Sequence, residues 1–318
     1  MISRRVLLSR LAAVAAGGAT VWAFRDRLPW PPLEVAFEGG RETPWLPLAQ
    51  GGGLIEIPVT VAGAPIRAVV DSGAQFSAID AGLAQRLGLP RTVAAPLLAY
   101  GVSGRPQMSH TVTAPLALPG LAIPALRPAA LQLADIAFVS GRDFQLLIGR
   151  DVLSRLVIEA DFPRRRARFL PRPRYHPPPD AVAIPLARKR GGPTAAVQVE
   201  AAPPLEVLVD TGATGILSLS EAAARAAGVL APGRPVSEAR SVSLGGLSSV
   251  RTTQARTVRV GRLMLRDVEV QVYRPADHAP AVSGLLGAGL LQPFRMALDL
   301  SGDRLWLTLP SPLIVPRN

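Results

Sequence analysis

The sequence contains no cysteine in 318 residues, which excludes thiol nucleophiles, disulfides and zinc–thiolate sites. Histidine is also scarce: His110, His176 and His278 lie in unrelated contexts, without the spacing of metal ligands and without a nucleophile beside them. The sequence therefore offers no constellation for Ser/His/Asp or metal-dependent hydrolysis. We expect neither a cofactor nor a metal site.

Lysine occurs once, at Lys189, so the net charge of +12 comes almost entirely from arginine. Basic residues cluster at 164–168 and 188–190, but no aromatic side chains are interleaved with them, as they are on surfaces that stack nucleic-acid bases. We therefore interpret the clusters as solvated basic edges and expect no nucleic-acid partner.

The apolar stretch at 11–24 has 14 residues and no charge, which is short of the ~20 residues that a membrane-spanning helix needs. It follows residues 3–8 (SRRVLL), which resemble a twin-arginine export signal. We predict that residues 1–28 form an export signal or, if they are retained, a membrane anchor. The functional part would then lie in the periplasm or on the outer face of the inner membrane.

A short motif is written twice in the chain. Residues 69–74 (VVDSGA) and 208–213 (LVDTGA) each describe a buried apolar strand that runs into a carboxylate, a hydroxyl and a glycine turn. Asp210 follows Asp71 by 139 residues. An aspartate at the end of a hydrophobic strand is costly to bury alone, whereas two of them, one per repeat, can meet on a pseudo-two-fold axis and share a proton.

Further landmarks repeat at nearly the same period. The segment LLIG at 146–149 matches GLLG at 284–287, and Asp161 in the first half matches Asp299 in the second. A short helix is predicted after each motif, and the sequence carries the usual N-cap and terminator residues for both: Asp80 and Gly88 in the first half, Ser220 and Gly228 in the second. An ordered duplication of this kind predicts two lobes of similar fold.

These residues resemble the aspartic peptidases, and more closely the retroviral-type (retropepsin-like) branch, because Ala74 and Ala213 follow the motif glycines. Both halves of the site are carried on one chain, so the resemblance is to a single-chain, duplicated and bacterial form of this branch. The resemblance implies a mainly β fold with short helices, in which two pseudo-symmetric lobes place the active site at their interface. The implied organisation is an export signal or anchor at 1–28, an N-terminal extension at 29–52, a first lobe at 53–170, a Pro/Arg-rich linker at 171–193 and a second lobe at 194–318.

The resemblance also implies roles for the motif residues. Asp71 and Asp210 would be the catalytic pair: one ionised, one protonated, with a water molecule activated between them and no metal involved. The hydroxyls of Ser72 and Thr211 are expected to hydrogen-bond across the lobe interface. The glycines that support the site, Gly73 and Gly212, would let the backbone turn tightly beside the substrate.

The sequence departs from the retroviral pattern beneath the site. That pattern has an acidic residue after the alanine, which pairs with an arginine at the start of a short helix. Gln75 and Thr214 stand at the acidic position here, and the second lobe has Ala288 where the first has Arg150. We therefore expect this support to be lost or replaced.

Each lobe has a glycine-containing segment that could cover the site as a hairpin flap. In the first lobe the candidates are Tyr100, Gly101 and Gly104, and in the second they are Gly245 and Gly246. An ordinary glycine-containing hairpin is an equally good interpretation of both segments.

The predicted activity is that of an aspartic endopeptidase acting on peptides or unfolded proteins, as a monomer. The alternative is a peptide- or protein-binding module of the cell envelope with the same fold and no turnover. A structural envelope component tethered by its N-terminal segment is a third class. A binding module has no need of a paired buried carboxylate, so the two motifs favour the enzyme.

Overall fold

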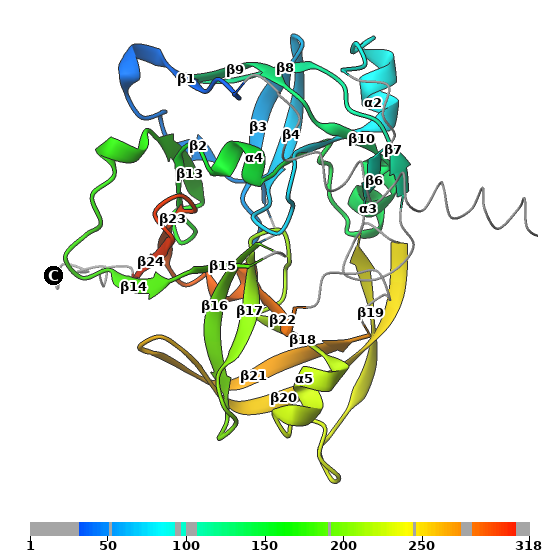
Figure 1. Cartoon of the computed structure of the whole chain (residues 1–318), viewed down its shortest axis with the longest axis vertical. Helices are drawn as coiled ribbons and strands as arrows, with labels where there is room; N and C mark the ends of the chain where they lie inside the picture. Colours follow the sequence, from blue (N-terminus) through cyan, green and yellow to red (C-terminus); the bar gives the residue numbers. More distant parts are fainter. Residues whose placement is uncertain are drawn as a thin grey trace, which may run out of the picture.

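The computed structural model describes residues 32–50, 53–92, 97–99, 107–189, 192–243, 246–274 and 282–309. It is mainly β, with short helices, and it is built from three large sheets and one two-stranded hairpin (Figure 1). Two of the large sheets belong to one lobe each, and the third joins them. The predicted fold class, two lobes with a mainly β architecture, is confirmed.

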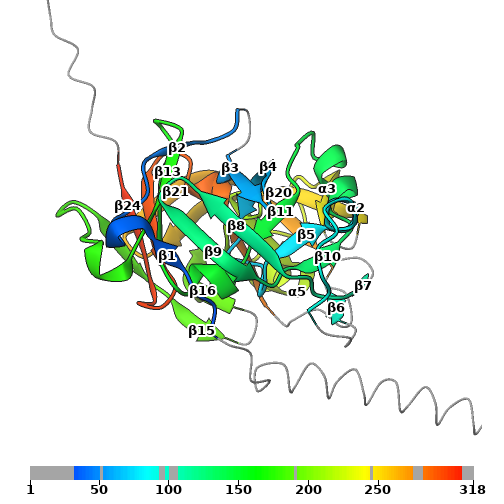
Figure 2. The same ribbon diagram turned by 90° about the horizontal axis from the view of Figure 1, so that it is seen from above.

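The first lobe is an eight-stranded sheet in the order β1-β9-β8-β3-β4-β11-β5-β10. Seen from above (Figure 2), β4, β11, β5 and β10 run towards the side of the molecule that carries α2 and α3. The elements of this lobe are β1 (Ala36–Phe37), η2 (Glu38–Gly40), β3 (Glu56–Val61), β4 (Ala64–Val70), β5 (Ala78–Asp80), α2 (Ala81–Arg86), β6 (Leu97–Ala99), β7 (Gln107–Ser109), β8 (Ala114–Leu118), β9 (Leu121–Leu126), β10 (Ala129–Leu131), α3 (Leu133–Val139), β11 (Leu146–Ile148) and α4 (Arg150–Leu153).

The second lobe is an eight-stranded sheet in the order β15-β16-β17-β22-β18-β21-β20-β19, with an additional pairing of β16 with β20. Its elements are β15 (Ala187–Lys189), β16 (Gly192–Val199), β17 (Leu205–Asp210), β18 (Leu217–Ser220), α5 (Glu221–Ala226), β19 (Ser237–Ser243), β20 (Gly246–Val260), β21 (Leu263–Tyr273), β22 (Gly284–Gly287) and η4 (Ala288–Leu290).

The two lobes repeat the same strand ladder. In the first, β4 runs parallel to β11, β11 antiparallel to β5, and β5 parallel to β10. In the second, β17, β22, β18 and β21 reproduce these three pairings with the same directions. The helices that follow are also equivalent, because the side chain of Asp80 caps α2 and that of Ser220 caps α5. The duplicated sequence landmarks therefore mark a duplicated structure.

The third sheet combines strands from both halves of the chain in the order β14-β24-β23-β12-β13-β2. Its centre is the antiparallel pairing of β12 with β23, in which Glu159 faces Ala297. These two residues are equivalent under the same repeat that relates Asp161 to Asp299, so the pseudo-two-fold axis passes between them. The strands are β2 (Leu46–Pro47), β12 (Val157–Asp161), β13 (Arg166–Leu170), β14 (Val182–Pro185), β23 (Arg295–Asp299) and β24 (Arg304–Thr308).

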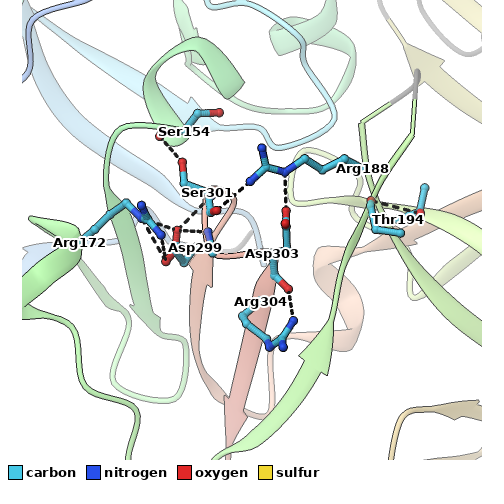
Figure 3. Close-up of polar contacts among 10 residues, drawn as sticks. Ser154, Arg172, Arg188, Thr194, Asp299, Ser301, Asp303 and Arg304 are labelled. Carbon is cyan, nitrogen blue, oxygen red and sulfur yellow. Dashed lines mark hydrogen bonds and ion pairs between the residues drawn. The ribbon is translucent and has the colours of Figure 1, made fainter.

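The segment predicted as an extended linker runs along the edges of two sheets. Its strand β14 pairs with β24, and β15 pairs with β16. Arg172, which lies in η3 (Arg172–Arg174), and Arg188 fix it to the β23–β24 turn by ion pairs with Asp299 and Asp303 (Figure 3). The same turn reaches the first lobe through Ser301, whose hydroxyl donates to the carbonyl oxygen of Ser154 at 2.5 Å. The segment thus holds the two halves together.

One large hydrophobic core extends through both lobes and the shared sheet. It consists mainly of branched aliphatic side chains from alternate strand positions, such as Ile57 and Val59 in β3 and Val258 and Val260 in β20. No helix in the described part of the chain is both long enough and apolar enough to cross a membrane.

Candidate active site

The structure brings the two motif aspartates together at the lobe interface. Asp71 directly follows β4, and its amide donates to the carbonyl oxygen of Ile148 at 2.9 Å; Asp210 is the last residue of β17 and pairs with Gly287. The two carboxyl groups share a hydrogen bond. Both residues keep some solvent-accessible surface, so a water molecule can reach the pair.

The motif hydroxyls exchange hydrogen bonds across the interface. The Oγ of Ser72 accepts from the amide of Thr211 at 3.0 Å and donates to the carbonyl oxygen of Val209 at 2.7 Å. In return, the Oγ1 of Thr211 accepts from the amide of Ser72 at 3.0 Å and donates to the carbonyl oxygen of Val70 at 2.8 Å. Both side chains are fully buried, so each lobe satisfies the backbone of the other where water has no access.

The motif glycines are needed for close approach. A Cβ atom on Gly73 would lie 2.6 Å from the Cγ of Asp210, and a Cβ on Gly212 would lie 2.5 Å from the Cγ of Asp71. Each glycine therefore lies directly against the carboxyl group of the opposite lobe. The amides of Gly73 and Ala74 also donate to the Oδ1 of Asp71, at 2.8 and 3.0 Å, and the amide of Gly212 donates to the Oδ1 of Asp210 at 2.9 Å.

Replacing Gly73 with alanine should lower kcat for peptide cleavage by about a hundredfold or more, because the added methyl group displaces the carboxyl group of Asp210 from its partner. Steady-state kinetics on a cleaved peptide measures this loss. Gly82→Ala is the matched control, since Gly82 lies in α2 and an alanine there meets only the ends of the Asp80 and Arg86 side chains. Equal activity of the two variants would contradict the close packing described here.

Burial and mutual repulsion keep protons on the aspartate pair. Loss of hydration raises the pKa of Asp71, while its backbone hydrogen bonds and the positive charge of Arg150 oppose the shift. The pKa of Asp210 is raised well above its ordinary range, first by burial and then by the negative charge of Asp71. Two carboxyl groups that share a hydrogen bond titrate as one unit, so the pair holds one proton between them at intermediate pH.

Arg150 is a charged neighbour of the aspartate pair, and the sequence did not predict that it would act there. It begins α4 in the first lobe, but its side chain reaches the second lobe, since a Cβ on Gly192 would meet its guanidinium group. Its charge acts on both Asp71 and Asp210. Because Ala288 occupies the equivalent position in the second lobe, only one lobe supplies a cation here.

The acidic residue that pairs with an arginine beneath the active-site loop in the retroviral pattern is absent, and other hydrogen bonds hold the two motif loops here. This agrees with the expectation that the support is lost or replaced. Asp151 takes over in the first lobe, where its Oδ1 accepts from the amide of Ser77 at 2.9 Å and from its hydroxyl at 2.8 Å. Backbone bonds are retained in both lobes: the amide of Arg150 donates to the carbonyl oxygen of Ala74, and that of Ala288 donates to Ala213. The position of Asp151 directly after Arg150 was the available sequence signal.

The flap candidates fall mainly outside the described residues, and this applies to Tyr100, Gly101, Gly104 and Gly245. The strands that flank them are described. β6 pairs antiparallel with β7, and β19 pairs antiparallel with β20, which begins at Gly246. Each candidate segment therefore connects the two strands of a hairpin. Across the described ranges, no cluster of three or more acidic or histidine side chains could hold a metal ion.

Comparison with known proteins finds a family model and solved structures that match the chain. A family model described as "Aspartyl protease" matches the chain twice, at residues 57–152 and 195–290, which together make up more than half of it. Each match contains one motif aspartate and the whole of the apolar-apolar-glycine segment that repeats with it. A solved structure of a retropepsin-like aspartic protease from Rickettsia conorii is 22% identical, covers 40% of this chain and 90% of its own, and has a TM-score of 0.31. No curated protein matches the chain.

Proposed function

The chain belongs to the aspartyl protease family, and we propose that it is an endopeptidase in which Asp71 and Asp210 activate a water molecule for attack on a peptide bond. The observation that carries this proposal is the hydrogen-bonded pair of aspartates, one from each repeat, with the pKa of both carboxyl groups raised. A pair that retains one proton supplies a general base and a general acid at the same place.

The surroundings of the two aspartates favour Asp71 as the ionised member. Backbone amides donate to both carboxyl groups, but the positive charge of Arg150 acts more strongly on Asp71 than on Asp210 and favours the negative form of Asp71. Asp210 carries the more strongly raised pKa, because the charge of Asp71 acts on it in addition to burial. In the proposed reaction Asp71 is therefore the base and Asp210 the acid.

The proposed reaction has two steps and no covalent intermediate. Asp71 takes a proton from the water molecule as its oxygen bonds to the carbonyl carbon of the substrate, and Asp210 gives its proton to the carbonyl oxygen. The tetrahedral centre then collapses: the hydroxyl proton returns to Asp210, the carbon–nitrogen bond breaks, and the proton held by Asp71 passes to the leaving nitrogen. Both aspartates end in their starting states.

Cleavage of a peptide library by the native chain tests this function, and its pH dependence tests the pair. We expect a bell-shaped profile of kcat/KM. The acid limb should lie above the pKa of an ordinary aspartate, because the pKa of Asp71 is raised. The basic limb should follow Asp210, whose proton is lost only at higher pH. A well-folded chain that binds peptides without cleaving any of them would indicate the binding module instead.

The N-terminal sequence supports a proposal about location. Residues 3–8 resemble a twin-arginine signal and precede a short apolar stretch, so we propose export of the chain to the periplasm or the outer face of the inner membrane. A retained segment would tether it there. Because one chain carries both aspartates, the proposed enzyme needs no second copy to complete its site and acts as a monomer.

A further inference from the structure

A cavity of about 390 Å³ lies beside the loop that follows Asp210, and the proposed reaction does not use it. Its lining comes from the second lobe and includes Thr214, Gly215, Glu269, Gln271, Gly289 and Gln292. Thr214 and Glu269 are exposed, so the cavity has a mouth that is open to solvent. It also borders the first lobe, because a Cβ on Gly53 would meet the side-chain amide of Gln292. The cavity is therefore accessible from the region where the two lobes meet.

The second lobe has glycines around this cavity where the first lobe has larger residues. A Cβ on the glycine of each apolar-apolar-glycine segment would meet the backbone of Phe76 in the first lobe and of Gly215 in the second, so these two residues are equivalent. Two positions after those glycines, the first lobe has Asp151 and the second has Gly289. Two positions that carry side chains in the first lobe thus carry none in the second, which leaves room for the cavity.

The charge beside the cavity also differs between the lobes. The strands β10 and β21 are equivalent, and the register of their pairings matches Ala129 with Gln271. Two residues earlier, the first lobe has Arg127 and the second has Glu269. Of the described residues that line the cavity, only Glu269 is charged, and within the described ranges it forms no ion pair. The cavity therefore presents one carboxylate without a counter-charge.

This chemistry suits a cationic side chain. The carboxylate of Glu269 attracts a positive charge and repels a negative one, and the amide oxygens of Gln271 and Gln292 accept hydrogen bonds. Thr214 follows Asp210 by four residues, which span at most about 14 Å. An extended peptide advances ~3.3 Å per residue, so a substrate side chain that enters the cavity belongs to a residue within about four positions of the cleaved bond.

We propose that this cavity is a substrate subsite for a lysine or arginine side chain, which Glu269 binds through its carboxylate. This inference rests on the proposed peptidase function and adds a substrate class to it. Arg127 stands at the equivalent position of the first lobe, where a positive charge disfavours a basic side chain. The preference for a basic residue should accordingly concern one side of the cleaved bond only.

Matched pairs of peptides, with lysine against glutamine or arginine against methionine at single positions within four residues of the cut, test this proposal. The native chain should cleave the basic peptide faster at one such position. Glu269→Gln should lower that preference, measured as a ratio of kcat/KM values, by about fivefold, the effect of one ion pair at a partly exposed site. Glu269→Lys should reverse the preference. Asp267→Asn is the matched control, because Asp267 is an exposed residue of the same strand that does not line the cavity.

A second variant tests the cavity separately from its charge. Gly215→Phe gives the second lobe the residue that the first lobe has at this position. A Cβ there would lie 3.6 Å from the side-chain amide of Gln271, which is an ordinary contact. This variant keeps Glu269 but fills the cavity, so the preference for a basic residue should be lost. In the native chain the preference should weaken as the ionic strength rises, because salt screens the ion pair.

The outcomes separate the subsite from the function itself. An unchanged ratio in Glu269→Gln, or an equal loss of kcat/KM for all peptides, overturns the subsite while leaving the peptidase intact. If the native chain binds peptides without cleaving them, the peptidase proposal fails, and the same ratio taken from binding affinities still decides the role of Glu269. A folded native chain that neither binds nor cleaves any of the peptides overturns both proposals.

Discussion

Peptide cleavage should fall at least about a thousandfold when either Asp71 or Asp210 is replaced by asparagine. An asparagine keeps the size of the side chain but can neither take a proton from water nor give one to the carbonyl oxygen. Because the proposed reaction needs both transfers, each single variant should be as inactive as the double variant. Steady-state kinetics on one cleaved peptide measures all three, with Asp267→Asn as a control at an exposed position of β21.

Asp210→Asn should also stabilise the folded chain at neutral pH. The pKa of Asp210 is raised by folding, so its contribution to stability is greatest below the pKa of the unfolded state and is lost as the pH rises through the folded value. Asparagine does not titrate and avoids this loss. The thermal midpoint of Asp210→Asn should therefore exceed that of the native chain by a margin that grows from acid to neutral pH. A variant that is inactive and also unstable at neutral pH would indicate misfolding.

Replacing both Ser72 and Thr211 with alanine should lower the free energy of unfolding more than any other change proposed here. Replacing Ser72 with alanine leaves the amide of Thr211 and the carbonyl of Val209 buried without partners, and Thr211→Ala does the same to Ser72 and Val70. Each buried unpaired group costs about 1–3 kcal/mol, so each single variant, which leaves two such groups, should lose about 2–6 kcal/mol of unfolding free energy, and the double variant more. That is a large fraction of the ~5–15 kcal/mol that stabilises a typical protein.

Denaturant unfolding measures these losses, and conservative swaps provide the control. Ser72→Thr and Thr211→Ser keep a hydroxyl at each position and should retain most of the stability. The alanine variants should cleave peptides more slowly without becoming inactive, because the aspartates remain while the loops that hold them loosen. If Ser72→Ala were as stable and as active as the native chain, the cross-lobe hydrogen bonds would not be what positions the pair.

The duplicated features could be predicted from the sequence, because each was written twice in a recognisable local context. The two aspartates, their hydroxyls and the helix caps at Asp80 and Ser220 all fall in this group. The pairing of β12 with β23 was not predicted. Although Asp161 and Asp299 were matched as equivalents, nothing in either strand indicates that it lies beside its own counterpart in a shared sheet.

Features that occur once were harder to predict. In the sequence, Arg150 stood out only because Gln75 occupies the acidic position of the retroviral pattern, since the contact of Arg150 with Gly192 depends on how the lobes pack.

The measurement that tests the shared proton most directly is carbon-13 NMR of the aspartate carboxyl groups in the native chain, titrated with pH. The Asp71→Asn and Asp210→Asn variants would assign the two signals. We predict that one proton is retained on the pair at pH values where exposed aspartates are fully ionised, with the more protonated signal assigned to Asp210. If both carboxyl groups instead ionise together in the ordinary range, they do not form a coupled pair, and the proposed mechanism is wrong.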